Sequence, residues 1–574
     1  MTTDKKEQLK LTLLSTVFFA ALAVLFGLGL GSVGLFDVLE ARTAQMSIEM
    51  LKAGPLGYVL FNGQNVMGEF PLMHILQMGA FHYFEPSAFS ARLPVAVLGF
   101  LFVFVLYNSM YILTTDKRFA LITASVGALN VAMVVLAKIA VPDSLFWFLT
   151  LCSTLMTMGS VFDLNKNYIR VMIAGFLAGG AFLAGGYGGI ILPLGVGLVL
   201  AFVRHQPAHN LQQLSPITFL LAAFLAIFPW AIGFVKAHSP DAFLTYFEAM
   251  LVNSWHTTID PSLLHPKQLI YYVLAFFPWS LFVIPALTRH LRHGTRYLTS
   301  NLIRQALPAV AMVWFVFGMV GLVFVEVQLS TIFYLMLIPT AILVADLFDK
   351  MPEKPLQSWH VLYIAPLCLV IAAGVMLAPQ WLHAARGDGA LAELIPHLSH
   401  IMPWHLPLGS ETTGYAMLGQ SVEWGMYPVL VGALVLVGTL VGVFIMRHGG
   451  REAALFVGGG ALMALMIGSW AAMPRAHEYK QQPLHWISKK IIKDQNIKTD
   501  HTIVYGVAAP SVRFEVPGVG SYIQNPSLVV RAPGRRLFVI TDKSHLESLE
   551  GHLPASAKPE CLGGYCLIEL FRMK

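Results

Sequence analysis

Residues 36–94 have the sequence FDVLEARTAQMSIEMLKAGPLGYVLFNGQNVMGEFPLMHILQMGAFHYFEPSAFSARLP. This polar, acid-bearing insertion separates two long apolar runs. Asp37 and Glu40 follow the first run directly, and a helix that begins there would place both carboxylates on one side. Helical spacing continues to Leu51, and a second amphipathic segment runs from Pro71 to Phe84. We expect both segments to be helices that lie along a membrane surface, with the acidic pair as a candidate reaction centre.

The composition places the chain among the α-helical polytopic membrane proteins. Of its 574 residues, 56% are hydrophobic and 12% are charged, a balance that a soluble protein of this size would not tolerate on its surface. The formal net charge of +6 invites the hypothesis of a nucleic-acid ligand. The basic residues are dispersed among short connections between apolar runs, so membrane topology explains them better.

Apolar runs of roughly 20 residues, the length that crosses a bilayer, occur about thirteen times. The first run is long and passes straight into an acidic helix, so we interpret it as a retained span rather than a cleavable signal peptide. The predicted spans lie near residues 11–33, 92–113, 119–138, 143–162, 170–186, 188–204, 215–236, 268–288, 305–326, 331–348, 358–378, 427–446 and 453–472.

Charge in the connections predicts the orientation. Lys5, Lys6 and Lys10 precede the first span, so the positive-inside rule places the N-terminus in the cytoplasm. Every second connection after that is also basic, at residues 114–118, 163–170, 204–209, 288–296, 349–354 and 447–452. The opposite face then receives the acidic insertion, the turn around Asp143, the loops 237–267 and 379–426, and the C-terminal tail.

The tail changes composition sharply, because it gains charge and loses long apolar runs. Residues 502–507 and 537–542 have the pattern of buried strands, and residues 485–495 that of a helix. We therefore predict two parts: a membrane domain over residues 1–473 and a small α/β domain outside the membrane over residues 474–574.

The four cysteines predict one disulfide at most. Cys152 and Cys368 fall in predicted spans and are interpreted as packing residues. Cys561 and Cys566 flank the sequence LGGY, and an oxidising compartment would allow them to close a hairpin. The sequence contains no zinc-site spacing and no phosphate-binding glycine loop. Its paired glycines lie in predicted spans, where small residues allow close helix packing.

Several stretches resemble one known superfamily. The runs EARTAQMSIEML, FNGQ, GEFPLMHILQMGAFHYF and SARLP are similar to the first external loop of the bacterial protein mannosyltransferases and aminoarabinose transferases. Further similarity lies in LAKIAVPDSLFWF, HPKQLIYYVLAFFPWSLFVIP, YLMLIPTAILVA and VYGVAAPSVRFEVPG. The resemblance covers nearly the whole chain, although each fragment alone would be weak.

The resemblance implies a type C glycosyltransferase in the bacterial inner membrane. Such an enzyme takes a sugar from a polyprenyl-phosphate carrier, such as undecaprenyl phosphate, and passes it to a lipid, glycan or protein acceptor at the periplasmic face. The carrier cannot leave the bilayer, so the site must open to the membrane. The chemistry needs a carboxylate that accepts the acceptor's proton and cations that stabilise the departing phosphate. No further cofactor is implied, and nothing in the sequence indicates a divalent metal.

The resemblance implies acidic site residues, with one departure from the family. Where the family has adjacent aspartate and glutamate, this chain has Leu39 and Glu40, and the nearest aspartate is Asp37. Asp143 matches the second acidic site of the family. Glu69 matches the acidic residue that precedes the prolines in the family's first external loop. We predict Asp37, Glu40 and Asp143 as catalytic residues, with Glu69 contacting the sugar.

A structural interpretation of the same acids stays open. Asp37 would then cap the surface helix, and Glu40 would form an ion pair with Arg42 or Lys138.

The phosphate-binding cations of the family are absent. Its three lysines fall on Phe70, Gly185 and the neighbourhood of Ser330. A phosphate at a membrane surface needs positive charge and hydrogen-bond donors. We predict Arg92 and Lys138, which occur in matching segments. Their alternative roles are to anchor a span at the interface and to extend along apolar surface. Lys236 and Lys267 are further candidates on the non-cytoplasmic face, and the weaker ones are His74, His82, His256 and His265.

Two functions from different classes remain open. The first is an active glycosyltransferase that uses a polyprenyl-phosphate-linked sugar and has an altered phosphate site. The second is a non-catalytic protein of the same fold that binds a polyprenyl lipid or a partner enzyme. We favour the first. The feature that discriminates them is whether Asp37, Glu40, Glu69, Asp143 and a cation converge on one site.

Overall fold

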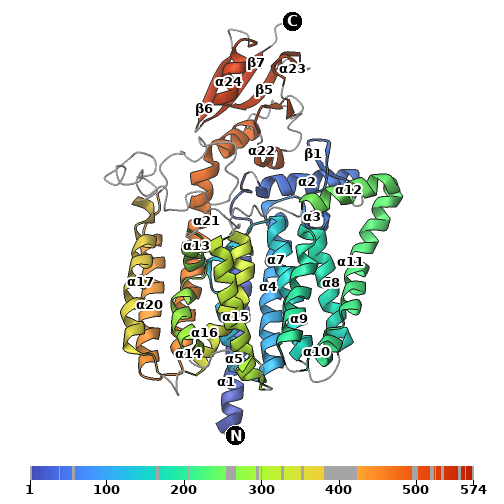
Figure 1. Cartoon of the computed structure of the whole chain (residues 1–574). Helices are drawn as coiled ribbons and strands as arrows, with labels where there is room; N and C mark the ends of the chain where they lie inside the picture. Colours follow the sequence, from blue (N-terminus) through green and yellow to red (C-terminus); the bar gives the residue numbers. More distant parts are fainter. Residues whose placement is uncertain are drawn as a thin grey trace.

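The computed structural model describes residues 3–571 except for Val38, 55–57, 163–166, His205, 254–266, 292–296, Thr299, Asn301, 325–328, 351–354, 381–422, 494–501, Ala508, 517–521, Gln524, 532–535, 554–556 and Gly563. A bundle of long helices forms one part, and a small domain stands on one end of it (Figure 1). The N-terminus lies at the opposite end of the bundle from this outer domain.

The bundle is built from helices joined by short connections. In chain order its elements are α1 (Thr3–Gly27), α4 (Ala88–Thr114), α5 (Lys117–Ala128), α6 (Val131–Leu136), α7 (Pro142–Phe162), α8 (Tyr168–Gly185), α9 (Gly188–Val203), α10 (Pro207–Leu214), α11 (Pro216–Ala237), α13 (Lys267–Ala275), the 3₁₀ helix η1 (Trp279–Phe282), α14 (Val283–Leu291), α15 (Ile303–Phe324), α16 (Leu329–Asp349), α17 (Ser358–Met376), α20 (Tyr427–Arg447) and α21 (Ala453–Lys493).

In the described part of the chain, ten helices are long and apolar enough to cross a membrane, or eleven if one bent pair is counted as a span. This confirms the polytopic class, with fewer full-length spans than the thirteen expected. The other three expected spans are interrupted or short. Residues 119–138 form two helices, residues 188–204 contain only α9, and residues 268–288 bend by 106° between α13 and η1.

Side-chain hydrogen bonds explain one of these interruptions. Asn130 accepts a hydrogen bond from the backbone N–H of Met133 at 2.9 Å and donates one to the carbonyl of Val126 at 3.0 Å, so it begins α6 and closes α5. The indole of Trp279, in η1, donates to the carbonyl of Leu129 at the same break, at 2.7 Å. Backbone groups freed by the break thus find partners inside the protein.

Close helix packing depends on small residues. Glycines at 175 and 179 of α8 face α11, and a Cβ at Gly175 would lie 2.1 Å from the carbonyl oxygen of Phe219. A Cβ at Gly179 would lie 2.2 Å from the carbonyl oxygen of Ala223. The predicted role of glycine pairs in helix packing is therefore confirmed for Gly179, which is followed by Gly180, and the single Gly175 packs in the same way.

The acidic insertion folds at the end of the bundle that carries the outer domain. It contains α2 (Leu39–Ala53), a hairpin of β1 (Val59–Phe61) and β2 (Gln64–Val66), and α3 (Pro71–Phe84). A further helix, α12 (Pro240–Asn253), joins them, and α2 and α12 run across the end of the bundle (Figure 1). The two helices predicted in the insertion are confirmed, whereas α12 was not expected.

The outer domain is a small α/β sheet domain, as predicted. Its strand order is β4 (Tyr522–Ile523), β3 (Thr502–Tyr505), β5 (Arg536–Asp542), β7 (Tyr565–Phe571) and β6 (Lys558–Leu562). Strand β3 pairs in parallel with β4 and β5, and β7 pairs antiparallel with β5 and β6. Its helices are α22 (Pro510–Glu515), α23 (Pro526–Arg531) and α24 (Lys543–Glu550). Cys561 and Cys566 are opposite each other on β6 and β7 and form the anticipated disulfide.

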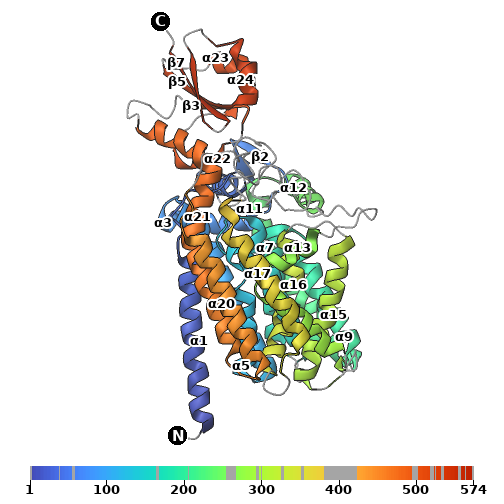
Figure 2. The same cartoon turned by 90° about the vertical axis from the view of Figure 1, so that its left-hand side faces the viewer.

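Helix α21 connects the two parts. It continues from the bundle into the outer domain (Figure 2), and Pro474 and Pro483 lie inside it. The predicted division between residues 473 and 474 falls within this helix, and that division stays a prediction.

Candidate functional site

Glu40 and Arg92 form a buried ion pair at the outer-domain end of the bundle. The guanidinium donates from Nε to Oε1 and from Nη2 to Oε2, each at 2.7 Å. Glu40 also accepts from the backbone N–H of Phe36 and of Ala140, both at 2.9 Å. Its two oxygens thus receive four hydrogen bonds, and the carboxylate is only 1% exposed.

The rest of the Arg92 guanidinium holds the chain that follows α1. Nη1 donates to the carbonyls of Leu30 at 2.8 Å and Val33 at 3.0 Å, and Nη2 donates to the carbonyl of Gly34 at 2.8 Å. Together with the two bonds to Glu40, these contacts use all five N–H groups of the side chain. No donor of Arg92 is left for a phosphate in this arrangement.

Lys138, like Arg92, donates a hydrogen bond to a backbone carbonyl of the chain that follows α1. Its Nζ donates to the carbonyl of Leu28 at 2.5 Å, at the point where α1 ends. Arg92 and Lys138 therefore donate hydrogen bonds to backbone carbonyls within residues 28–34. These bonds favour a structural role for both side chains over the predicted phosphate-binding role.

Asp37 joins the insertion to the outer domain. Its carboxylate accepts hydrogen bonds from the backbone N–H of Ser511, at 2.9 Å, and from the Ser511 hydroxyl. Burial raises the pKa of Asp37 to about 7 despite these bonds, and the negative charge of Glu515 adds to the shift. Ser511 lies in the first turn of α22, so Asp37 satisfies a backbone group of a helix in the other domain.

Two of the structural alternatives for these acids need correction. The expectation that Asp37 caps the surface helix is wrong, because its carboxylate binds α22 instead of α2. The expectation that Glu40 pairs with Arg42 or Lys138 is also wrong, because its partner is Arg92.

Glu69 and Asp143 lie near each other at the same end, with Arg42 beside them. Burial raises the pKa of the Glu69 carboxyl above its ordinary value; the positive charge of Arg42 opposes this shift and the negative charge of Asp143 adds to it. Asp143 is in the first turn of α7 and is exposed. Asp143 lies three residues after Ala140, and the backbone N–H of Ala140 donates to Glu40. Glu40, Glu69 and Asp143 therefore lie at the same end of the bundle.

Close packing against α12 positions Glu69. Gly68 has a φ of +73°, and a Cβ there would lie 2.6 Å from the backbone of Ala249 in α12. The amide of Asn253 donates to the carbonyls of Met67 at 3.3 Å and Gly68 at 3.2 Å, and the Tyr246 hydroxyl donates to the carbonyl of Glu69 at 2.6 Å. The unexpected helix α12 therefore fixes the segment that carries Glu69.

Arg42 is the cation that the sequence prediction did not assign to the site. Its Nε is buried and has no hydrogen-bond partner in the described part of the chain. Its guanidinium carbon lies 5.2 Å from the centroid of the Phe61 ring. The signal was present in the sequence, since Arg42 stands in the run EARTAQMSIEML. Arg42 as a whole is half-buried. A buried arginine N–H without a hydrogen-bond partner is typical of a place that receives an anion.

The remaining cation candidates differ in position. His74 is fully buried, and burial lowers its pKa to about 4, so it is neutral at physiological pH and is not a phosphate-binding cation. A Cβ at Gly185 would lie 2.6 Å from the ring of Phe146, so that ring occupies the space that a lysine at this position would need. His256 and His265 lie outside the described residues.

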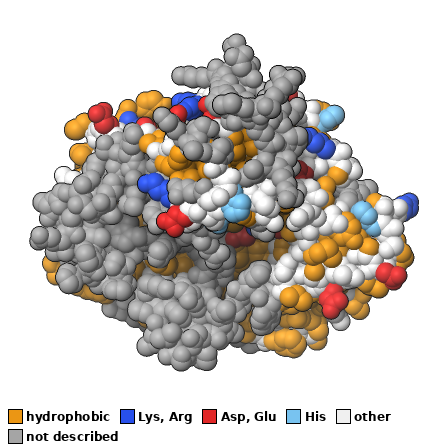
Figure 3. Space-filling view, turned by 90° about the horizontal axis from the view of Figure 1, so that it is seen from above, with side chains coloured by type: hydrophobic (Ala, Val, Ile, Leu, Met, Phe, Trp, Pro, Cys, Tyr) orange, Lys and Arg blue, Asp and Glu red, His pale blue; other side chains and the backbone are white. Residues whose placement is uncertain are grey.

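The end of the molecule seen from above has mixed chemistry. Acidic, basic and histidine side chains are dispersed among apolar and uncharged ones on the described surface (Figure 3). Within the residues that the structure describes, no group of three or more histidine, cysteine, aspartate or glutamate side chains could hold a metal ion.

The chain is similar to one protein family over its N-terminal part and to two solved structures over nearly its whole length. Residues 10–241 match the family described as dolichyl-phosphate-mannose-protein mannosyltransferase. Two crystal structures of ArnT from Cupriavidus metallidurans are similar over 96% of this chain and 97% of each ArnT chain. The apo structure has a TM-score of 0.69 at 16% identity, and the structure bound to undecaprenyl phosphate has 0.70 at 15% identity. No curated protein matches the sequence.

The family match covers the N-terminal part of the chain, and the fold match covers a membrane protein of the ArnT type. The chain shares the ArnT fold over nearly its whole length. The resemblance to the mannosyltransferase and aminoarabinose transferase superfamily is thereby confirmed.

Proposed function

We propose that the chain transfers a sugar from a polyprenyl-phosphate carrier to an acceptor hydroxyl, and that Arg42, Glu69 and Asp143 carry the reaction. The observation that carries this proposal is the meeting of these three side chains at one end of the bundle, with a buried Nε of Arg42 unsatisfied. The ArnT structure bound to undecaprenyl phosphate supports a carrier of this kind.

Each residue has a distinct part in the proposed reaction. Glu69 accepts the proton of the acceptor hydroxyl, because a carboxylate whose pKa is raised toward neutrality is a better base than an ordinary one. The acceptor oxygen then bonds to the anomeric carbon as the bond from that carbon to the phosphate oxygen breaks. Arg42 stabilises the charge that develops on the leaving polyprenyl phosphate. Asp143 orients the sugar or the acceptor.

Asp37, Glu40, Arg92 and Lys138 support the site in this proposal. Glu40 and Arg92 fix the start of α2, and Arg42 is two residues further along the same helix. The proton-accepting role first predicted for Asp37 and Glu40 passes to Glu69, and the phosphate-binding role of Arg92 and Lys138 passes to Arg42.

The proposal also places the protein in the bacterial inner membrane. The N-terminus would be cytoplasmic, and the outer domain with the candidate site would be periplasmic. Support comes from the basic connections at the N-terminal end and from the Cys561–Cys566 disulfide in the outer domain, which suits an oxidising compartment.

One observation favours a second function. Leu39 is 47% exposed at the start of α2, where the superfamily has an aspartate. Without that carboxylate, the chain would be a non-catalytic protein that binds a polyprenyl lipid or a partner enzyme.

Turnover by the purified full chain in lipid nanodiscs separates the two functions. The donors are undecaprenyl phosphate carrying mannose or aminoarabinose, the acceptor is an envelope lipid extract, and released undecaprenyl phosphate is measured. We expect release above the protein-free control for a donor that the protein binds. Tight binding of undecaprenyl phosphate with no release from any donor would support the non-catalytic function.

A further inference from the structure

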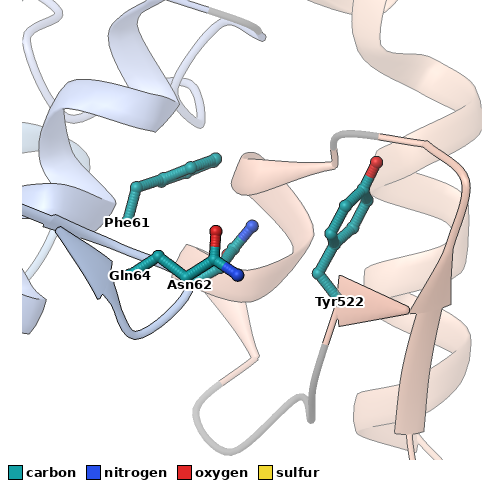
Figure 4. Close-up of a pocket in the computed structure, with 4 residues that line it drawn as sticks. All are labelled: Phe61, Asn62, Gln64 and Tyr522. Atoms are coloured by element: carbon teal, nitrogen blue, oxygen red, sulfur yellow. The ribbon is translucent and has the colours of Figure 1, made fainter. Parts of the chain in front are cut away.

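A cavity of about 210 Å³ lies between the acidic insertion and the outer domain. Its walls are Phe61, Asn62 and Gln64 of the β1–β2 hairpin and Tyr522 of β4. The two rings face the cavity from opposite sides, and the amide side chains of Asn62 and Gln64 lie between them (Figure 4).

The hairpin side of the cavity is held rigidly. Asn62 and Gly63 both have positive φ values, 57° and 75°, which is the turn that an Asn-Gly pair favours in a two-residue hairpin. The Glu49 carboxylate on α2 accepts from the backbone N–H of Asn62 at 3.1 Å and of Gly63 at 2.9 Å. Gln45, one turn earlier on α2, donates to the Asn62 side-chain oxygen at 3.0 Å. The turn is therefore fixed to the helix that also carries Arg42.

The lining matches the chemistry of a neutral, hydroxylated ring. The four lining side chains are uncharged, and two of them offer aromatic faces for apolar C–H surface. The Asn62 Nδ2 and the Gln64 amide have no hydrogen-bond partner within the described residues, so both are available to hydroxyl groups, which donate and accept. Few polar groups set among apolar walls are typical of small-molecule sites.

The cavity also adjoins the proposed reaction centre. Phe61 forms one of its walls and is the same ring that Arg42 lies over, with 5.2 Å between the guanidinium carbon and the ring centroid. Phe61 thus both lines the cavity and contacts the residue proposed to bind phosphate.

We propose that this cavity is a subsite for a sugar ring of the acceptor, and hence that the acceptor carries a glycan. The proposal rests on the proposed function, because it names the acceptor class of the same site. The insertion and the outer domain each supply one ring, so the subsite forms only when the two are docked.

Binding of soluble sugars to the full chain in nanodiscs, without donor, tests the subsite. Saturation-transfer NMR would use methyl mannoside, methyl glucoside and N-acetylglucosamine as probes. We expect at least one probe to bind the wild type and Tyr522→Ala to weaken it roughly fivefold or more. Tyr522→Phe keeps the ring and should retain most binding. Asn65→Ala, a neighbour that does not line the cavity, should bind like the wild type.

Three results would overturn the subsite: no probe binds the wild type, Tyr522→Ala binds as well as the wild type, or a serine-rich peptide binds in place of sugars. Undecaprenyl phosphate binding, measured in parallel on the wild type, separates this proposal from the proposed function. Sugar binding that depends on Tyr522, without binding of undecaprenyl phosphate, would leave the subsite standing and remove the transferase proposal.

Discussion

Glu40 and Arg92, 52 residues apart in the sequence, form a bidentate ion pair that is almost completely buried. The pair ties the first turn of α2 to α4, and Arg92 also binds three carbonyls of the chain after α1. Three segments therefore meet at one guanidinium. Such a pair holds these segments in a fixed arrangement, and neither its carboxylate nor its guanidinium is free to act as a base or to bind phosphate.

Glu40→Gln should therefore destabilise the protein. Removing one partner of a buried ion pair costs roughly 3–5 kcal/mol, because the other charge is left unpaired. Thermal unfolding in detergent measures this loss, and Glu85→Gln, at an exposed acid, is the matched control. If Glu40→Gln unfolds like the wild type but loses turnover, Glu40 is catalytic, as first predicted from the sequence.

Arg42→Ala should weaken undecaprenyl phosphate binding by about tenfold or more with little change in stability. A charge-assisted contact to phosphate contributes on the order of 1.5–3 kcal/mol, and the Arg42 Nε has no partner to lose. Titration of undecaprenyl phosphate into nanodiscs measures the affinity. Lys52→Ala, at the other end of α2, is the control, and equal affinity of Arg42→Ala and Lys52→Ala would exclude Arg42 from the phosphate site.

Lys138→Met should lower stability and leave the affinity for undecaprenyl phosphate unchanged. The Lys138 Nζ is committed to the carbonyl of Leu28, and a hydrogen bond from a charged group contributes about 1.5–3 kcal/mol. Unfolding and lipid titration on the same sample check both parts. A loss of lipid affinity at unchanged stability would restore the phosphate-binding role predicted for Lys138.

Asp37 should make stability depend on pH. Its pKa rises from 3.8 to about 7 on folding, so the folded protein holds this proton more tightly than the unfolded chain. The contribution of Asp37 to stability is then fully present below about pH 4 and is lost as pH rises to about 7, with a slope of at most about 1.4 kcal/mol per pH unit. Melting temperatures of wild type and Asp37→Asn between pH 4 and 8 test this.

Asp37→Asn should have a flatter profile than the wild type, since its amide can still pair with Ser511 without titrating. Parallel profiles for the two proteins would show that other groups cause the dependence.

Hydropathy predicted the membrane class, composition and strand patterns predicted the outer α/β domain, and charge in the connections predicted the end of the bundle at which the acids gather. The hydropathy pattern predicted more spans than the described part of the structure has, because an average over about 20 residues does not detect a local break in a helix. Asn130 interrupts one expected span by capping α6, and the FFPW run at 276–279 interrupts another. Both signals are visible in the sequence as a cap residue and a proline.

The partners of the site residues were beyond the reach of sequence reasoning. Asp37 binds Ser511 across 474 residues and Glu40 binds Arg92 across 52, and no local pattern indicates such pairs. The same lack hid Arg42, whose proposed role depends on its unpartnered buried Nε and on its position near Glu69.

Turnover of an undecaprenyl-phosphate-linked sugar by Glu69→Gln and Asp143→Asn, corrected for the folded fraction of each sample, tests whether these two acids carry the sugar transfer. We expect turnover at least about 100-fold below the wild type in Glu69→Gln, a marked loss in Asp143→Asn, and wild-type melting temperatures in both. Wild-type turnover in both variants would show that neither Glu69 nor Asp143 takes part in the transfer, and the proposed site with Arg42 would be excluded.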